Sequence, residues 1–161
     1  MPPESRRYIP PTGLAPFRAQ YRLRLTVGDH SARHIRAISR SLLTEWERAE
    51  LTDAVELGVT ELVANVVRHV RDWRCDVVAL RTPGGVRVEV TDGCGRLPVF
   101  PAEPQPDAEN GRGLLLLDAV ADKWGGDTRG AAGKTVWFEC AMRSSERELE
   151  FPRPATLEPR P

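Results

Sequence analysis

A carboxylate and a carboxamide stand one helical turn apart in an apolar run, as Glu61 and Asn65 of the segment Glu-Leu-Val-Ala-Asn. Residues four apart share a face of a helix, so both side chains would point the same way. Oxygen ligands of this kind suit Mg²⁺, and Glu61 could instead take a proton from a hydroxyl group as a general base. A solvated helix face is the ordinary interpretation, and the segment taken alone favours it.

An aspartate follows three valines that recur at every second position, so Asp92 would continue their face of a strand. The valines are Val86, Val88 and Val90. A carboxylate on this apolar face must accept hydrogen bonds, and the exocyclic amine of adenine is one such donor. Alternatively, the strand ends at Thr91 and Asp92 begins an Asx turn, which is a common role for an Asp-Gly pair. The residues alone leave both interpretations open.

Two glycines, Gly111 and Gly113, precede the leucine run that starts at Leu114. Backbone N–H groups at the start of a helix can hold phosphate oxygens, and the helix dipole favours the negative charge. A plain junction between loop and helix, with Asn110 as its cap, is the alternative. The pair of glycines therefore indicates a flexible helix start that could contact a phosphate.

A second glycine-rich segment, from Gly130 to Thr135, ends in Gly-Lys-Thr as a P-loop does. A P-loop must open a helix, whereas residues 136–140 are rich in the β-branched and aromatic types that favour strands. We therefore reject a P-loop here. Lys134 and Thr135 could still reach a phosphate from a neighbouring strand, or they could simply begin an ordinary strand.

Periodicity predicts the elements that must position these residues. Alternating residues indicate strands, apolar residues every three or four positions indicate helices, and Pro83-Gly84-Gly85 indicates a hairpin turn. The expected order is a strand at 21–27, helices at 31–46 and 52–70, paired strands at 75–80 and 86–92, a long loop at 97–110, a helix at 114–121 and a strand at 134–142. This order predicts an α/β two-layer sandwich, with a mixed, mostly antiparallel sheet and helices on one face.

Details of the two long helices follow from the same patterns. We expect Asp29 or Ser31 to cap the first helix, and Thr52 or Asp53 to cap the second. Gly58 is expected in the polar stripe of the second helix, beside Glu61 and Asn65. Seven apolar residues of that helix are expected to face inward: Val55, Val59, Leu62, Val63, Val66, Val67 and Val70. Residues 125–133 are expected to form a turn region.

Length and composition limit the alternatives. A chain of 161 residues suits one domain, here expected at 19–143 between a flexible arm at 1–18 and a flexible tail at 144–161. A formal net charge of +0 gives no reason to expect direct nucleic-acid binding, and no apolar run is long enough to span a membrane. Cys75, Cys94 and Cys140 form no metal-like pair, which favours a reducing, cytoplasmic location.

Taken together, Glu61…Asn65, the segment Asp92 to Gly95, the segment Gly111 to Asp118 and the segment Gly133 to Phe138 resemble the GHKL (Bergerat-fold) ATP-binding superfamily. Within it the chain is similar to the stand-alone anti-sigma factor serine/threonine kinase-like regulators of actinobacterial type. The resemblance runs from about Tyr21 to Met142 and implies the Bergerat ATP-binding fold. It also implies ATP and Mg²⁺ as cofactors.

The resemblance implies a role for each candidate residue. Asn65 would ligate Mg²⁺ between the ATP phosphates, and Glu61 would be the catalytic base towards a partner's serine or threonine. Asp92 would bind the adenine amine, and Thr135 would support the adenine end of the nucleotide. The remaining nucleotide contacts would come from Gly95, Gly111, Gly113 and Leu114, and residues 97–110 would form the ATP lid.

The implied function is an ATP-dependent protein serine/threonine kinase that phosphorylates a small STAS-type anti-sigma factor antagonist and sequesters a sigma factor. The resemblance also implies a homodimer. One departure from the family pattern stands out. With Asp92 as the aspartate of Asp-x-Gly-x-Gly, Cys94 and Arg96 replace both glycines. This motivates an alternative, a catalytically silent binding module that acts by sequestering a partner. A different ATP-dependent hydrolase on this fold ranks last.

Overall fold

A computed structural model describes residues 20–97 and 109–143 of the chain. Its elements are β1 (Gln20–Thr26), α1 (Ser31–Glu45), η1 (Ala49–Leu51), α2 (Thr52–His69), β2 (Arg74–Thr82), β3 (Gly85–Asp92), α3 (Glu109–Val120), β4 (Lys123–Thr128), η2 (Gly130–Ala132) and β5 (Lys134–Ala141). The arm expected at 1–18, the tail expected at 144–161 and most of the expected lid lie outside the described residues.

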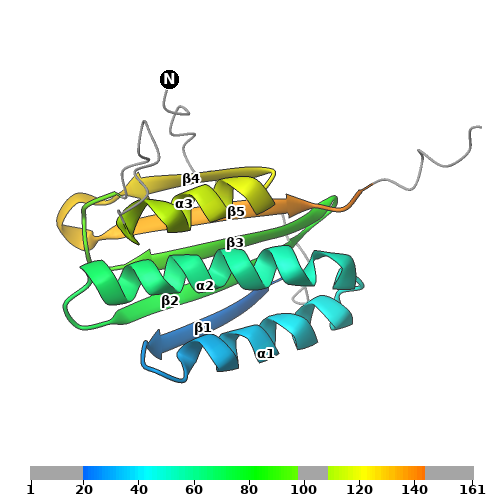
Figure 1. Cartoon of the computed structure of the whole chain (residues 1–161), viewed down its shortest axis with the longest axis horizontal. Helices are drawn as coiled ribbons and strands as arrows, with labels where there is room; N and C mark the ends of the chain where they lie inside the picture. Colours follow the sequence, from blue (N-terminus) through cyan, green and yellow to red (C-terminus); the bar gives the residue numbers. More distant parts are fainter. Residues whose placement is uncertain (1–19, 98–108, 144–161) are drawn as a thin grey trace, which may run out of the picture.

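The five strands form one sheet in the order β1-β2-β3-β5-β4. Figure 1 shows α1, α2 and α3 on one face of this sheet, with α2 between the other two helices. The predicted two-layer α/β class is confirmed. Every strand pairing in the described part of the chain is antiparallel, so the sheet contains none of the parallel pairs that a mixed sheet would have. The β2–β3 and β4–β5 pairs follow short connections, whereas segments that contain helices join β1 to β2 and β3 to β5.

Strand β4 was not predicted, because its Gly125 and Gly126 are typical of turns and are poor strand formers. In the structure it pairs antiparallel with β5, and Gly125 lies opposite Trp137. A Cβ atom at residue 125 would come within 2.8 Å of the Trp137 ring. The glycine therefore leaves room for the indole against β4. Side-chain packing, rather than strand propensity, places this edge strand.

Helix α2 carries most of the inward-facing apolar residues, as predicted, with two exceptions. Val67 is 42% exposed, because it lies about 100° around the helix from the buried Val66 and falls outside the apolar stripe. Gly58, expected in the polar stripe, is buried instead. A Cβ atom there would come within 2.6 Å of the Phe138 ring of β5. The absent side chain thus lets α2 approach the sheet closely.

The predicted helix caps are wrong. The N-cap residues are His30 and Leu51, and neither cap position makes a side-chain hydrogen bond. The hydroxyl group of Ser31 instead accepts a hydrogen bond from the Gly28 N–H at 2.8 Å. The single turn of η1 leads directly into α2, and the Leu51 N–H donates to the Arg48 carbonyl oxygen at 2.9 Å. A preceding 3₁₀ turn therefore takes the place of a capping side chain.

Candidate nucleotide site

Asp92 and Lys134 face each other across the two central strands. Strand β3 ends at Asp92, β5 begins at Lys134, and the two residues are direct partners in the register. Their side chains are 4% and 5% exposed, and the Lys134 Nζ atom lies 2.9 Å from each carboxylate oxygen. Asp92 shares the helix-covered face of β3 with the buried Val86, Val88 and Val90. The predicted inward orientation of the carboxylate is confirmed.

The same carboxylate also begins an Asx turn. The Cys94 N–H donates to Asp92 Oδ1 at 2.8 Å. The predicted Asx turn is therefore present, but the strand continues to Asp92 and does not end at Thr91. Ionised aspartate offers about four lone-pair positions. Among the described residues, two donors contact Oδ1 and one contacts Oδ2, which leaves Oδ2 with capacity for a further donor.

Glycines hold the segment after β3 against the turn between β4 and β5. Gly133 has a φ of +104°, and a side chain there would overlap the Asp92 carbonyl oxygen. A side chain at Gly95 would overlap the Gly130 carbonyl oxygen, and the Thr128 hydroxyl group donates to the Gly95 carbonyl oxygen at 2.9 Å. The segment Asp92 to Gly95 and the segment Gly133 to Thr135, which are distant in sequence, are thus packed together.

Thr135 lies next to this pair in sequence but on the opposite face of the sheet. Side chains alternate along a strand, so Thr135 points away from the face that holds Lys134. Its hydroxyl group lies 2.8 Å from that of Thr91, its partner in the register. The expected contact of Thr135 with adenine stays a prediction that this orientation does not favour. The side chain beside Asp92 belongs to Lys134, which the sequence interpretation directed towards a phosphate.

Glu61 and Asn65 are half-buried on α2. They follow Gly58 by three and seven residues, so they lie along the same side of the helix. Because Gly58 contacts the Phe138 ring of β5, this side faces β5 and the neighbouring α3 rather than α1. Glu61 and Asn65 therefore lie on the side of α2 that packs towards β5 and α3.

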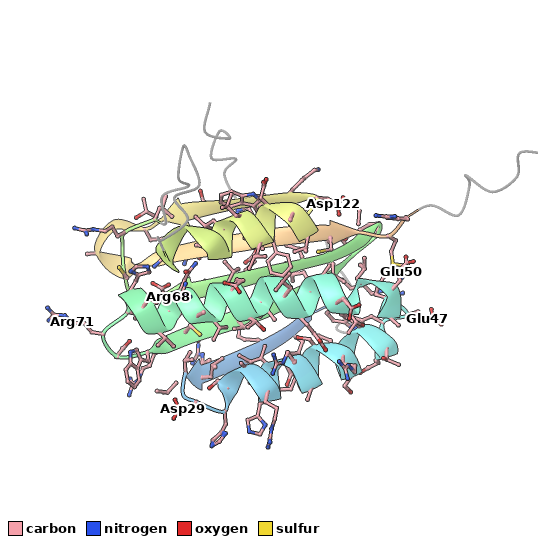
Figure 2. All side chains as sticks on the ribbon, viewed as in Figure 1. Asp29, Glu47, Glu50, Arg68, Arg71 and Asp122 are labelled. Carbon is pink, nitrogen blue, oxygen red and sulfur yellow. The ribbon has the colours of Figure 1, made fainter. Side chains whose placement is uncertain are left out.

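The amide oxygen of Asn65 accepts a hydrogen bond from Arg68. Arg68 Nη1 donates to Asn65 Oδ1 at 3.3 Å, and the bond is solvent-exposed. In Figure 2, Arg68 lies near the C-terminal end of α2 on the α3 side, whereas Arg71 points away from the body of the molecule. An exposed bond of this length is readily exchanged for another ligand, so the Asn65 oxygen can turn to a cation.

Helix α3 begins earlier than predicted. It starts at Glu109, so Gly111 and Gly113 lie in its first turns instead of before it. Leu114 and Leu117 are 1% and 0% exposed, which makes Leu114 a core residue. Burial of these leucines against α2 outweighs the helix cost of two glycines, about 1 kcal/mol each. Any phosphate contact from this segment would have to come from backbone N–H groups.

Four candidate segments meet at one end of the molecule. In Figure 1 the arrowhead of β3, the start of β5, the C-terminal half of α2 and the N-terminal end of α3 all lie at the same end. Asp92 in the sheet and Asn65 in the helix layer thus lie at the same end of the molecule. The structure brings together the segments that the sequence pattern selected.

Burial at this end of the sheet also affects a thiol. Cys75 lies opposite Asp92 in the register of β2 and β3. Burial, helped by the carboxylates of Asp92 and Asp76, raises the pKa of the Cys75 thiol to about 11. Cys75 is therefore a neutral thiol at pH 7. The surroundings of Asp92 are poorly hydrated on this side, which strengthens its hydrogen bonds.

Comparison with known proteins agrees with this geometry. The profile of the family described as "Histidine kinase-like ATPase domain" matches residues 27–140. An uncharacterized protein of Streptomyces coelicolor is 39% identical over 75 residues, which cover 45% of this chain and 71% of the relative. A crystal structure of the RsbU and RsbW domains of Rv1364c from Mycobacterium tuberculosis superposes with a TM-score of 0.54 at 24% identity, covering 75% of this chain and 32% of that one.

The chain belongs to the histidine kinase-like ATPase domain family. This confirms the predicted resemblance to the GHKL superfamily, and the family implies an ATP-binding domain. The likeness to the mycobacterial structure establishes a shared fold, and the chain spans about a third of that protein. No helix within residues 20–97 and 109–143 is long and apolar enough to cross a bilayer.

Proposed function

We propose that this protein is an ATP-binding regulator of the anti-sigma factor type, which phosphorylates a serine or threonine of a small antagonist protein. The observation that carries the proposal is the carboxylate of Asp92. It is buried on the helix-covered face at the end of a central strand, and one oxygen retains capacity for a further donor. The exocyclic amine of adenine supplies such a donor.

The other groups needed for ATP fit the same region. The Asn65 side chain offers a half-buried amide oxygen, whose exposed bond to Arg68 is easily exchanged. Asn65 would hold Mg²⁺ through this oxygen, since Mg²⁺ prefers oxygen ligands. When bound, Mg²⁺ would neutralise charge on the β- and γ-phosphates. The backbone N–H group of Gly111, in the first turn of α3, is the proposed phosphate contact, and Gly113 is the proposed boundary of the lid. Gly95 is the proposed nucleotide contact after Asp92.

Glu61 is the proposed base. In the transfer step, the hydroxyl oxygen of the partner's serine or threonine forms a bond to the γ-phosphorus, and the bond from that phosphorus to the bridging oxygen of ADP breaks. Glu61 takes the hydroxyl proton. Phosphoryl transfer depends mainly on positioning and charge neutralisation. One carboxylate beside the reacting hydroxyl group is therefore enough to serve as the base.

The proposed partners are a sigma factor, which the protein sequesters, and a STAS-type antagonist, which is the phosphoryl acceptor. The non-phosphorylated antagonist would release the sigma factor. A homodimer and a cytoplasmic location belong to the same proposal. Family membership and the shared fold with a structure that contains an RsbW domain support it.

Thermal unfolding tests nucleotide binding directly. Wild type and Asp92→Asn are heated with ATP or ADP, with and without Mg²⁺. Ligand at about a hundredfold over its dissociation constant stabilises the folded state by about 2.7 kcal/mol, a shift of several degrees for a domain of this size. We expect a Mg²⁺-dependent shift in wild type and a much smaller one in Asp92→Asn. No shift in wild type would contradict the nucleotide site.

One observation favours a second candidate, a binding module that sequesters a partner without chemistry. The Asp92 carboxylate is already held by a buried ammonium group, and Cys94 and Arg96 stand where the family has glycines. This candidate predicts that partner binding survives Asp92→Asn. If partner binding and nucleotide binding disappear together in that variant, the kinase-like regulator is the better account.

A further inference from the structure

Lys134 is a buried cation in the middle of the candidate site. The chain contains two lysines, and the other, Lys123, is exposed at the start of β4. Lys134 is 4% exposed overall and lies on the helix-covered face of β5, directly opposite Asp92. Lysine is almost never buried to this extent without a partner. The position therefore needs an explanation beyond ordinary strand packing.

The hydrogen bonds of Lys134 differ in quality. Its ammonium group has three N–H donors. Two short contacts, both 2.9 Å, go to the two oxygens of Asp92. The third contact goes to the Cys94 carbonyl oxygen and is 3.4 Å long. This long contact is the one that Lys134 gives up most readily for a better acceptor.

The pair thus presents two adjacent hydrogen-bonding groups of opposite kind. Asp92 Oδ2 has capacity to accept, and Lys134 Nζ, 2.9 Å away, has one weakly used donor. Adenine presents the complementary pattern, because its exocyclic amine donates while the ring nitrogens beside it accept. Guanine carries a carbonyl oxygen in place of that amine, and this oxygen would face the Asp92 carboxylate.

We propose that Lys134 helps to recognise adenine. Its ammonium group donates a hydrogen bond to the ring nitrogen beside the exocyclic amine, and that amine donates a hydrogen bond to Asp92. The proposal rests on the proposed ATP binding and assigns a specificity role to a second residue. Asp92 alone recognises an amine. Asp92 together with Lys134 recognises an amine and a neighbouring acceptor, which favours adenine over a base with the reverse pattern.

The test compares ATP with 1-deaza-ATP and 7-deaza-ATP, each of which lacks one of the two ring nitrogens next to the amine. Dissociation constants are measured by calorimetry for wild type, Lys134→Met and the control Lys123→Met. We expect wild type to lose about tenfold in affinity for one of the two analogues, as for a lost charge-assisted hydrogen bond. The analogue that loses affinity identifies the edge of the base that Lys134 contacts.

The decisive quantity is the ratio of the two dissociation constants, for the sensitive analogue and for ATP, within one variant. This ratio should fall to about one in Lys134→Met and keep its wild-type value in Lys123→Met. A purely structural effect of Lys134→Met would weaken all ligands alike and leave the ratio unchanged. Wild-type binding that is equal for all three nucleotides, or an unchanged ratio in Lys134→Met, would overturn the proposal.

Removing the lysine alone leaves a buried carboxylate without its partner and destabilises the fold, so a second variant is needed. The double variant Asp92→Asn/Lys134→Met removes both charges and keeps an oxygen acceptor at residue 92. Its ATP binding is expected to be weaker, so its dissociation constants are measured at correspondingly higher nucleotide concentrations. It should also show a ratio near one, and a wild-type ratio in it would again overturn the proposal. Failure of wild type to bind ATP at all would instead overturn the proposed function, together with this inference.

Discussion

The ring of Phe138 occupies the space that a side chain at Gly58 would need. A Cβ atom at residue 58 would come within 2.6 to 3.0 Å of three ring carbons, and Phe138 is fully buried. The contact joins the middle of α2 to β5, the strand that carries Lys134. It therefore sets how closely the helix with Glu61 and Asn65 approaches the strand at the base of the site.

We predict that Gly58→Ala destabilises the fold by about 1 kcal/mol. Overpacking of about 1–3 kcal/mol is partly offset by the gain of about 1 kcal/mol in helix propensity. Urea unfolding measures the change, and Gly84→Ala is the control, since a Cβ atom there meets nothing within 4 Å. Phe138→Leu in the Gly58→Ala background should recover part of the loss. A Gly58→Ala protein as stable as wild type would contradict the prediction.

Glu61→Gln should lower the rate of phosphoryl transfer to the antagonist at least about a hundredfold while ATP affinity stays unchanged. Glutamine keeps the size of the side chain and loses the ability to take a proton. Transfer is followed with radiolabelled ATP, and affinity by calorimetry. Glu56→Gln on the α1 side of the same helix is the matched control, where Glu56 pairs with Arg40 at 3.0 Å. Loss of ATP affinity in Glu61→Gln would contradict its assignment as the base.

Asn65→Ala should remove the Mg²⁺-dependent part of the ATP-induced thermal shift and leave the Mg²⁺-independent part. The reason is that the variant lacks the proposed oxygen ligand and keeps the adenine contacts. Arg68→Ala, which removes the donor to Asn65 Oδ1, should keep its dependence on Mg²⁺. A Mg²⁺-dependent shift that persists in Asn65→Ala would show that the cation is held by other groups.

Two buried thiols make stability fall at high pH. Burial is the main cause that raises the pKa of Cys75 and Cys140 from 9.0 to about 11 each. The unfolded chain therefore loses these protons first, so the free energy of unfolding falls between pH 9 and pH 11. The loss approaches about 3 kcal/mol per thiol, and the full contribution is present below pH 9.

Urea unfolding at pH 8 and pH 10.5 checks this prediction. Wild type is compared with Cys75→Ala and Cys140→Ala, which lack one titrating thiol each. The stability difference between wild type and each variant should shrink at the higher pH. A difference that is independent of pH would contradict the assigned direction of the pKa shifts.

The sequence predicts most of what is local in this structure. Alternation in 86–92 predicts strand β3 and the inward side of Asp92, because a strand fixes the direction of each side chain relative to its neighbours. The apolar period of α2 likewise predicts its buried stripe, apart from Val67 and Gly58. Both are properties of a single segment and need no knowledge of what packs against it.

What the sequence does not predict depends on contacts between distant segments. Strand β4 was not predicted because its Gly125 makes room for the Trp137 ring, which is a contact between two segments. The start of α3 was predicted too late because the burial of Leu114 outweighs the low helix propensity of the two glycines. The ion pair of Lys134 with Asp92 was not predicted because it depends on the register of β3 and β5. One signal was available, since Lys134 precedes the buried Val136 and Phe138 at every second position.

The strand order has a consequence for how this chain acquires its function while it folds. Strands β3 and β5 are neighbours in the sheet, yet Asp92 and Lys134 are separated by 42 residues, with α3 and β4 between them. Closing a loop of this length costs entropy before the strand pair repays it, so contacts of this range form slowly. The β2–β3 hairpin can form early and still lack half of its charged pair. If the proposed function holds, nucleotide binding therefore requires β5 to dock beside β3.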